Sequence, residues 1–308
     1  MNGANSIPVT IISGYLGAGK TTLVNNALRK ANGLKLAILV NEFGNLAIDE
    51  DLIISQDENM ISLAGGCICC SYGNDMLLSL KELTSLDSKP DHIILEASGV
   101  AIPSSIERSI SLIDDCYTES IVSIVDSEQI QDQLSNKYVS DTVLAQIKSA
   151  DLIFANKTDL IMDKKSFLSW IKNHHLLNKA IMVSYSNVEL DVLLGANRRL
   201  GVLRQPSQEI KANHTGIFWS KVFIPNEFVD PIEFSKSLTQ QNMHLVRAKG
   251  HLRGIDGNMY LLQTVGHRYY VDIADNEKKL GLVLIGTTET ENLDALRINL
   301  KKYGDFSY

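Results

Sequence analysis

An octapeptide near the amino terminus constrains this chain more than any other feature. Residues 14–21 read G-Y-L-G-A-G-K-T, between an apolar run at residues 7–12 and a helix-like stretch with one apolar face. Glycines permit a tight loop whose backbone N–H groups point at phosphate oxygens, and the following helix adds the positive end of its dipole. Lys20 would then reach the β- and γ-phosphates, and the hydroxyl of Thr21 would take a place on Mg²⁺. We therefore predict a nucleotide-binding loop here.

Apolar, β-branched runs recur along the first two thirds of the chain, with helix-like stretches between them. This alternation predicts repeated β-α units around a mainly parallel sheet. The strands are expected at residues 7–12, 36–40, 92–95, 120–125, 152–155 and 180–183. The predicted fold class is α/β, a P-loop NTPase with a mainly parallel sheet flanked by helices, plus a smaller C-terminal α+β domain.

A polar stretch without apolar periodicity separates the two parts, and we place a linker there. The expected division is a nucleotide domain at residues 1–195, a linker at 196–215 and a C-terminal domain at 216–308. In the C-terminal domain, strands are expected at residues 217–224, 244–248, 258–265, 268–273 and 282–285, and helices at 231–240 and around Leu293, Leu296 and Leu300. This order predicts a sheet covered by helices.

The composition excludes several classes of protein. The formal net charge is -7, whereas a general nucleic-acid binder needs a basic face for the phosphate backbone. No apolar run approaches the length needed to cross a bilayer, and residues 1–6 form a short polar lead without a signal-peptide core. We expect a cytoplasmic protein that binds neither nucleic acid nor membrane.

Two further motifs supply what a nucleotide site of this class needs. Residues 93–99 read I-I-L-E-A-S-G, so Glu96 leaves the end of a strand, where its carboxylate would hold the water shell of Mg²⁺, and Gly99 would place its N–H near the γ-phosphate. Residues 154–159 read F-A-N-K-T-D, and Asp159 would accept hydrogen bonds from N1–H and the exocyclic amine of guanine. Adenine lacks this pair of donors, so GTP is preferred over ATP.

Three of the four cysteines lie in the segment G-G-C-I-C-C at residues 65–70. Two glycines let the backbone turn sharply, so the thiolates of Cys67, Cys69 and Cys70 can converge on a soft or borderline cation such as Zn²⁺, Co²⁺ or Cu⁺. Three thiolates leave a tetrahedral ion one ligand short, which suits delivery of a metal better than permanent structural binding. A redox-active thiol cluster and buried small apolar residues are the alternatives, and Cys116 is expected to pack as a small hydrophobe.

Taken in order, five motifs resemble those of the CobW-like family of metallochaperone GTPases, relatives of the UreG and HypB nickel-insertion GTPases. They are G-Y-L-G-A-G-K-T-T from residue 14, N-E-F-G from residue 41, G-G-C-I-C-C from residue 65, E-A-S-G from residue 96 and N-K-T-D from residue 156. The resemblance covers the nucleotide domain closely and continues more loosely into the tail. It implies slow, Mg²⁺-dependent GTP hydrolysis coupled to loading zinc or cobalt into a client metalloprotein, and it is compatible with a homodimer.

The motif match also assigns roles to individual residues. Catalysis would involve Lys20, Asp49 and Glu96, with Asp49 orienting the attacking water or Mg²⁺. GTP or GDP would be bound by Gly14, Gly17, Ala18, Gly19, Lys20, Thr21, Thr22, Gly99, Asn156, Lys157 and Asp159. Thr21 and Glu96 would hold Mg²⁺, and the transition-metal cargo would be bound by Cys67, Cys69 and Cys70.

Two other functional classes stay open at this point. A nucleotide-gated redox or regulatory switch would use the same phosphate loop without carrying metal. A small-molecule kinase would also use this loop, but it would need an acceptor pocket and would accept ATP. Stoichiometric metal separates the first class from a metallochaperone, and a comparison of ATP with GTP turnover separates the second.

Overall fold

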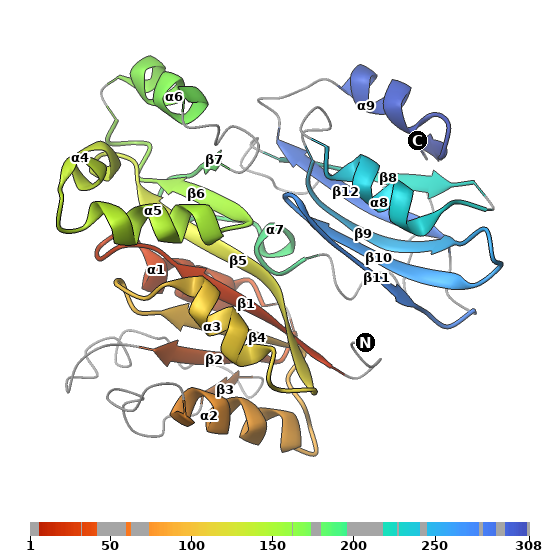
Figure 1. The fold of residues 1–308 in the computed structure, drawn as a ribbon, viewed down its shortest axis with the longest axis horizontal. Helices are drawn as coiled ribbons and strands as arrows, with labels where there is room; N and C mark the ends of the chain where they lie inside the picture. The colour runs from red at the N-terminus through yellow and green to blue at the C-terminus, as the bar shows by residue number, and fades with distance from the viewer. Residues whose placement is uncertain are drawn as a thin grey trace. The chain divides into compact units, whose positions relative to one another are not determined.

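Two sheets, one parallel and one antiparallel, organise the described part of the chain in a computed structural model (Figure 1). They belong to two units, residues 2–194 and residues 195–308. The structure describes residues 6–31, 33–41, 60–62, 74–161, 163–173, 180–195, 218–226, 228–240, 245–276, 280–287 and 293–306. The linker expected at 196–215 lies outside these ranges, so the domain boundaries stay a prediction.

The first unit alternates strands and helices, as β-α units do. Its described elements are β1 (Ile7–Ser13), α1 (Lys20–Arg29), β2 (Leu36–Asn41), β3 (Met60–Ser62), α2 (Asn74–Ser85), β4 (His92–Ala97), α3 (Pro103–Ile110), β5 (Cys116–Asp126), α4 (Ile130–Ser135), α5 (Ser140–Ser149), β6 (Leu152–Asn156), α6 (Lys164–Asn173), β7 (Ala180–Met182) and α7 (Leu190–Leu194). The described strands form a seven-stranded sheet in the order β3-β2-β4-β1-β5-β6-β7, and each neighbouring pair is parallel. The predicted α/β fold class is confirmed.

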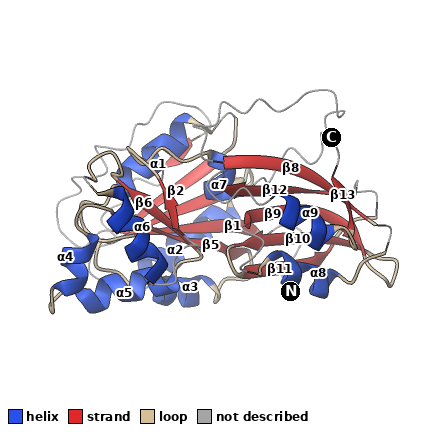
Figure 2. Ribbon diagram, turned by 90° about the horizontal axis from the view of Figure 1, so that it is seen from above, coloured by secondary structure: helices blue, strands red, loops and turns tan. Residues whose placement is uncertain are grey.

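The central strands are apolar on both faces because helices cover both faces of the sheet. Each residue of β4 and β6 is buried. Figure 2 shows α1 on one side of the sheet and α3 and α5 on the other. On the side of α3 and α5, Ile106 and Ile147 belong to the same core cluster as Ile11 of β1. This packing fixes the carboxyl ends of four adjacent strands, β4, β1, β5 and β6, along one edge of the sheet.

Strand β5 is longer than its apolar run predicts. The sequence indicates residues 120–125, whereas the strand spans Cys116–Asp126. The added residues include Thr118 and Glu119, which are polar but buried. The register of β5 against β1 shifts at Glu119, which is an extra residue in the ladder, as in a β-bulge. Polar side chains at a bulge break the apolar pattern, so the pattern alone misses the beginning of this strand.

Cys116, at the start of β5, is buried in the apolar core of the first unit. Burial raises the pKa of its thiol to about 11, and the carboxylate of Asp115 adds to the shift. The thiol is therefore neutral at physiological pH, where only a thiolate would react or bind metal. The prediction that Cys116 packs as a small hydrophobe is confirmed.

The second unit is an antiparallel sheet with helices packed on it. Its described elements are β8 (Phe218–Pro225), α8 (Pro231–Leu238), β9 (Leu245–Arg253), β10 (Met259–Val265), β11 (Arg268–Ile273), β12 (Gly281–Thr287), α9 (Leu293–Leu300) and β13 (Gly304–Phe306). The described strands form a six-stranded sheet in the order β11-β10-β9-β12-β8-β13. Phe234 of α8 and Leu296 of α9 share one core with sheet residues such as Phe223 and Leu262. The predicted α+β class of this part is confirmed.

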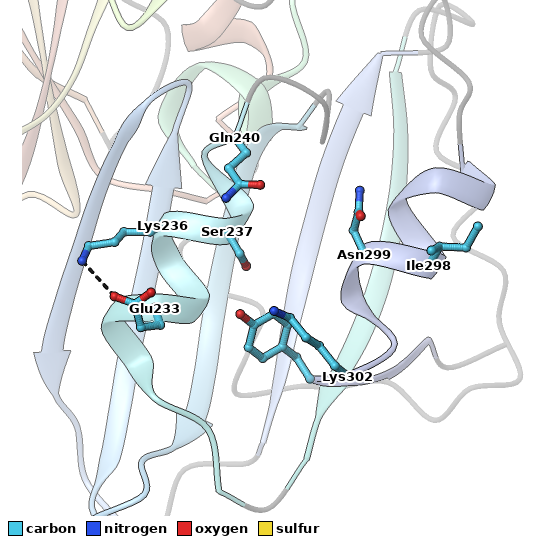
Figure 3. A pocket seen from close by; sticks show the side chains of 8 residues that line it. Glu233, Lys236, Ser237, Gln240, Ile298, Asn299 and Lys302 are labelled. Carbon is cyan, nitrogen blue, oxygen red and sulfur yellow. Dashed lines mark hydrogen bonds and ion pairs between the residues drawn. The ribbon is translucent and has the colours of Figure 1, made fainter.

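A cavity of ≈ 420 Å³ opens between α8 and the end of α9 (Figure 3). It is lined by Glu233, Lys236, Ser237, Gln240, Ile298, Asn299, Lys302 and Tyr303. Lys236 donates to Glu233 at 2.9 Å across one turn of α8, so much of its charge is compensated on its own helix.

Among the described residues of both units, every helix is too short or too polar to span a bilayer.

Candidate nucleotide-binding site

The loop between β1 and α1 has a backbone that only glycine accommodates at two positions. Gly14 has φ 144°, and a Cβ there would lie 2.2 Å from the carbonyl oxygen of Ile124. Gly19 has φ 109° and caps α1, which begins at Lys20. Because a glycine cap has no side chain to satisfy the first N–H groups of the helix, these donors and the helix dipole favour an anion at this end. The predicted phosphate loop therefore has the backbone that such a loop requires.

Thr21 and Glu96 are brought together from the ends of two adjacent elements. The hydroxyl of Thr21, in the first turn of α1, donates to Glu96 Oε1 at 2.9 Å. Glu96 is paired with Ile12 in the β1–β4 register and is 4% exposed. A hydroxyl and a carboxylate are hard oxygen donors, which are the ligands that Mg²⁺ prefers. The two side chains thus fit the predicted magnesium site.

Asn156 connects the base-recognition segment to the phosphate loop. Its Nδ2 donates to the carbonyl oxygen of Ala18 at 2.9 Å and to Ser186 Oγ at 2.9 Å. Its Oδ1 accepts from the backbone N–H of Ser186 at 2.8 Å. All of these bonds are buried, where a hydrogen bond is harder to replace by water. The segments that the sequence assigns to phosphate and to guanine are therefore parts of one bonded assembly.

Lys157 and Asp126 form an ion pair beside this assembly. Lys157 adopts φ 62°, and its Nζ lies 2.6 Å from Asp126 Oδ2. Asp126 is 2% exposed and also accepts from the backbone N–H of Glu128. The pair spans the ends of β5 and β6, where Asp126 stands opposite Asn156. It orients the segment that leads to Asp159, whose side chain is exposed and accessible to a ligand.

The loop after β7 is a part of the site that the sequence reasoning missed. Thr158 is hydrogen bonded to Ser184 Oγ at 2.9 Å, and Ser186 Oγ donates to the carbonyl oxygen of Gly19 at 3.0 Å. Ser186 is 1% exposed and adopts φ 51°, a conformation that costs energy in residues other than glycine. Asn26 of α1 donates to its carbonyl oxygen. The available signal was that this loop follows a parallel strand, and such loops gather at the ligand edge of an α/β sheet.

Substitutions at Ser186 separate its two contributions to stability. Ser186→Ala removes the hydroxyl, which bonds to Asn156 and Gly19, but keeps a Cβ at positive φ. Because these buried hydrogen bonds are lost, we expect the free energy of unfolding to fall by about 2 kcal/mol. Ser186→Gly also removes the hydroxyl but relieves the backbone, so it should be more stable than the alanine variant by about 1 kcal/mol. Urea denaturation measures both variants. Equal stability of the two would contradict the claim that the backbone of Ser186 is strained.

The remaining predicted residues divide into those that the structure places and those outside its described ranges. Lys20 is half-buried at the start of α1, Thr22 is exposed beside it, and Gly99 is buried in the turn after β4. Outside the described ranges lie Asp49, Cys67, Cys69 and Cys70. The described residues contain no cluster of three or more His, Cys, Asp or Glu side chains that could hold a metal ion.

Comparison with known proteins agrees with this geometry. The family model "CobW/HypB/UreG, nucleotide-binding domain" matches residues 8–183, and the model "Cobalamin synthesis protein cobW C-terminal domain" matches residues 218–302. The chain is 34% identical to a zinc chaperone CobW from Sinorhizobium sp over 183 residues, which cover 50% of this chain and 52% of the relative.

Two further relatives come from other organisms. The chain is 33% identical over 166 residues to zinc-regulated GTPase metalloprotein activator 1 of Schizosaccharomyces pombe, covering 50% of this chain and 40% of that protein. It is 28% identical over 201 residues to the zinc chaperone YjiA of Escherichia coli, covering 63% and 62%. The chain thus spans about half the length of the curated relatives it matches. Because the first family model matches more than half of the 308 residues, the chain belongs to the CobW/HypB/UreG family.

Proposed function

We propose that this chain is a GTP-hydrolysing metallochaperone, which binds a transition metal at its C-x-C-C motif and couples GTP binding and hydrolysis to metal transfer to a client protein. The hydrogen bond between Asn156 and Ala18 is the observation that carries the nucleotide part of the proposal. These residues are 138 positions apart in the sequence. Their contact joins the candidate base-recognition segment to the candidate phosphate loop, as one nucleotide that spans both would require.

At the phosphate end, the proposed roles follow from charge and position. Lys20, at the positive end of α1, would neutralise the β- and γ-phosphates, and the N–H of Gly99 would approach the γ-phosphate. Thr21 and Glu96 would hold Mg²⁺, which when bound supplies positive charge that stabilises the phosphates as the bond to the γ-phosphoryl group breaks. Asp49 is proposed to orient the attacking water.

At the base end, the carboxylate of Asp159 would choose guanine. It offers two acceptor oxygens to the N1–H and exocyclic amine of the base, and adenine presents no such pair of donors. Asp159 is exposed, while the preceding Thr158 is anchored by a 2.9 Å bond from its hydroxyl to the carbonyl oxygen of Val183. An exposed carboxylate on an anchored loop is suited to bind a base without first rearranging.

For the metal cargo, we propose that Cys67, Cys69 and Cys70 bind Zn²⁺, with Co²⁺ as the second candidate. Three thiolates form a strong but incomplete site for a tetrahedral ion. Zinc is favoured because similar proteins carry the names zinc chaperone and zinc-regulated GTPase metalloprotein activator. The coupling hypothesis is that metal and γ-phosphate each change the affinity for the other.

Replacing one thiol should weaken metal binding without affecting the fold. We expect Cys69→Ser to lower the affinity for Zn²⁺ at least about tenfold, because a hydroxyl is a much poorer zinc ligand than a thiolate. Cys116→Ala is the matched control, since Cys116 is buried in the core with a protonated thiol, and its zinc affinity should equal that of the wild type. Competition with a chromophoric chelator under reducing conditions measures both. Equal affinities of Cys69→Ser and the wild type would exclude this thiol as a ligand.

Metal analysis of anaerobically purified protein, with and without GTP and Mg²⁺, tests the proposed function as a whole. The expected result is about one zinc or cobalt ion per chain, with an affinity that differs between a non-hydrolysable GTP analogue and GDP. Protein that holds no metal but forms a disulfide on oxidation would favour a nucleotide-gated redox switch. ATP turnover well above GTP turnover would favour a kinase instead.

A further inference from the structure

The turn that follows β4 is fixed from two sides. Its residues 98–101 form a reverse turn, in which the N–H of Ala101 donates to the carbonyl oxygen of Ser98 at 3.0 Å. On one side lies the phosphate loop, because a Cβ on Gly99 would meet Leu16 Cδ2 at 2.4 Å and the backbone nitrogen of Leu16 at 3.1 Å. A side chain at Gly99 would have to displace the exposed Leu16 side chain and would press against the backbone of the loop, and glycine avoids both. The turn is therefore in contact with the segment proposed to hold the phosphates.

On the other side, one side chain from α5 binds the turn. Gln146 Nε2 donates to the carbonyl oxygens of Gly99 and Ala101, each at 3.0 Å. A primary amide has two N–H donors, so this turn uses both of them. Gln146 is 1% exposed, and its neighbours on α5, Val143 and Ile147, are buried in the core. The amide is thus held by a packed helix and cannot turn toward solvent without breaking both bonds.

We propose that Gln146 is a positioning residue that holds the turn of residues 98–101 against the phosphate loop, and so sets how strongly the site prefers GTP to GDP. The inference rests on the proposed function, in which the N–H of Gly99 meets the γ-phosphate. GDP has no γ-phosphate, so the position of the turn contributes to the binding of GTP and not to that of GDP. Moving the turn changes the affinity for a nucleotide only if that nucleotide contacts the turn.

A purely structural role makes a different prediction. Two buried hydrogen bonds also stabilise the fold, and losing them would leave two carbonyl groups without these donors. Such a loss lowers the free energy of unfolding but weakens GTP and GDP binding to the same extent. The ratio of the two affinities therefore separates positioning from stabilisation, whereas either affinity alone does not.

The test compares variants of the full chain on the same helix. Gln146→Leu has no amide to hold the turn. If the leucine variant does not fold, Gln146→Met is used instead, because methionine keeps the length and the unbranched shape of the glutamine side chain. Val143→Ala is the control, because it removes core packing from α5 but keeps the amide of Gln146 that bonds to the turn. The measurements are titrations with fluorescent GDP and a non-hydrolysable GTP analogue in Mg²⁺, and thermal unfolding without nucleotide.

We expect Gln146→Leu to lower the ratio of GTP-analogue affinity to GDP affinity about tenfold, the effect of about one hydrogen bond. The ratio for Val143→Ala should equal that of the wild type although its unfolding temperature falls. If wild-type protein prefers the GTP analogue and the Gln146 variant keeps the same preference at lower stability, the inference is overturned and the proposed function stands. If wild-type protein binds neither nucleotide, both are overturned.

Discussion

Replacing Asp159 by asparagine is expected to turn a preference for GTP into a preference for XTP, changing the ratio of the two affinities about a thousandfold or more. In the proposed site the carboxylate would accept from two donors of guanine, and hydrogen bonds to charged groups are the stronger ones. An asparagine amide offers one acceptor and a donor group instead. Xanthine has a carbonyl where guanine has the exocyclic amine, so the amide matches xanthine and mismatches guanine.

The structure makes this substitution a clean test of base recognition. Asp159 is exposed, so losing its charge should leave the fold intact. The loop that carries Asp159 is anchored by hydrogen bonds of the Thr158 hydroxyl to the carbonyl oxygen of Val183 and to Ser184 Oγ. Competition of GTP, XTP and ATP against fluorescent GDP gives the three affinities. Asp141→Asn, an exposed carboxylate in the first turn of α5, is the control for charge alone and should keep the wild-type order.

An Asp159→Asn variant that binds GTP within about threefold of the wild type would contradict the assignment of this residue to guanine, since two lost hydrogen bonds should weaken binding more. If that variant and the wild type also bind ATP as well as GTP, the kinase alternative gains support.

Replacing Lys20 by alanine is expected to reduce GTP turnover at least about a hundredfold, the scale of losing one charged group that stabilises the transition state. Lys20 is the first residue of α1 and directly follows Gly19, the N-cap of this helix, which has no side chain to cover the helix start. The other lysine of the described motifs, Lys157, has its Nζ 2.6 Å from Asp126 Oδ2, so its charge is already paired. The charge on the phosphates would then be met only by backbone N–H groups and Mg²⁺.

The control for this prediction is Lys148→Ala, which removes an exposed lysine from the last turn of α5 and should leave turnover unchanged. Phosphate release under saturating GTP measures turnover, and thermal unfolding without nucleotide checks the fold. Lys20 is half-buried rather than part of the apolar core, so the unfolding temperature of Lys20→Ala should differ from that of the wild type by only a few degrees. Turnover within about threefold of the wild type would contradict the proposed role.

Much of the fold could be predicted because its signals are local. The strands of the first unit are short apolar runs, and in a parallel sheet covered on both faces such runs mark strands directly. The prediction missed the polar beginning of β5, where the bulge lies, and the two short strands β3 and β13. The equally short β7 was predicted. Burial of polar residues depends on what packs against them, which no local pattern contains.

The candidate site divides in the same way. Lys20, Thr21, Glu96 and Asn156 were predicted from motifs, because the required residue types stand at fixed spacings around a strand end. Ser186, by contrast, lies in a loop whose sequence is unremarkable for nucleotide binding. Its bond to Gly19 joins residues 167 positions apart, a distance over which spacing carries no information.

The sequence by itself determined that a phosphate loop follows the first strand, that a carboxylate and an N-K-T-D segment end two later strands, and that the cysteines are clustered. Only the tertiary structure decided how the phosphate loop, the carboxylate and the N-K-T-D segment are held together. Asp126, Gln146 and Ser186 do this by hydrogen bonds between strand ends, turns and helices that meet at one edge of the parallel sheet. The physical reason is that motifs encode the groups that face a ligand, whereas the groups that position them are chosen by packing among distant segments.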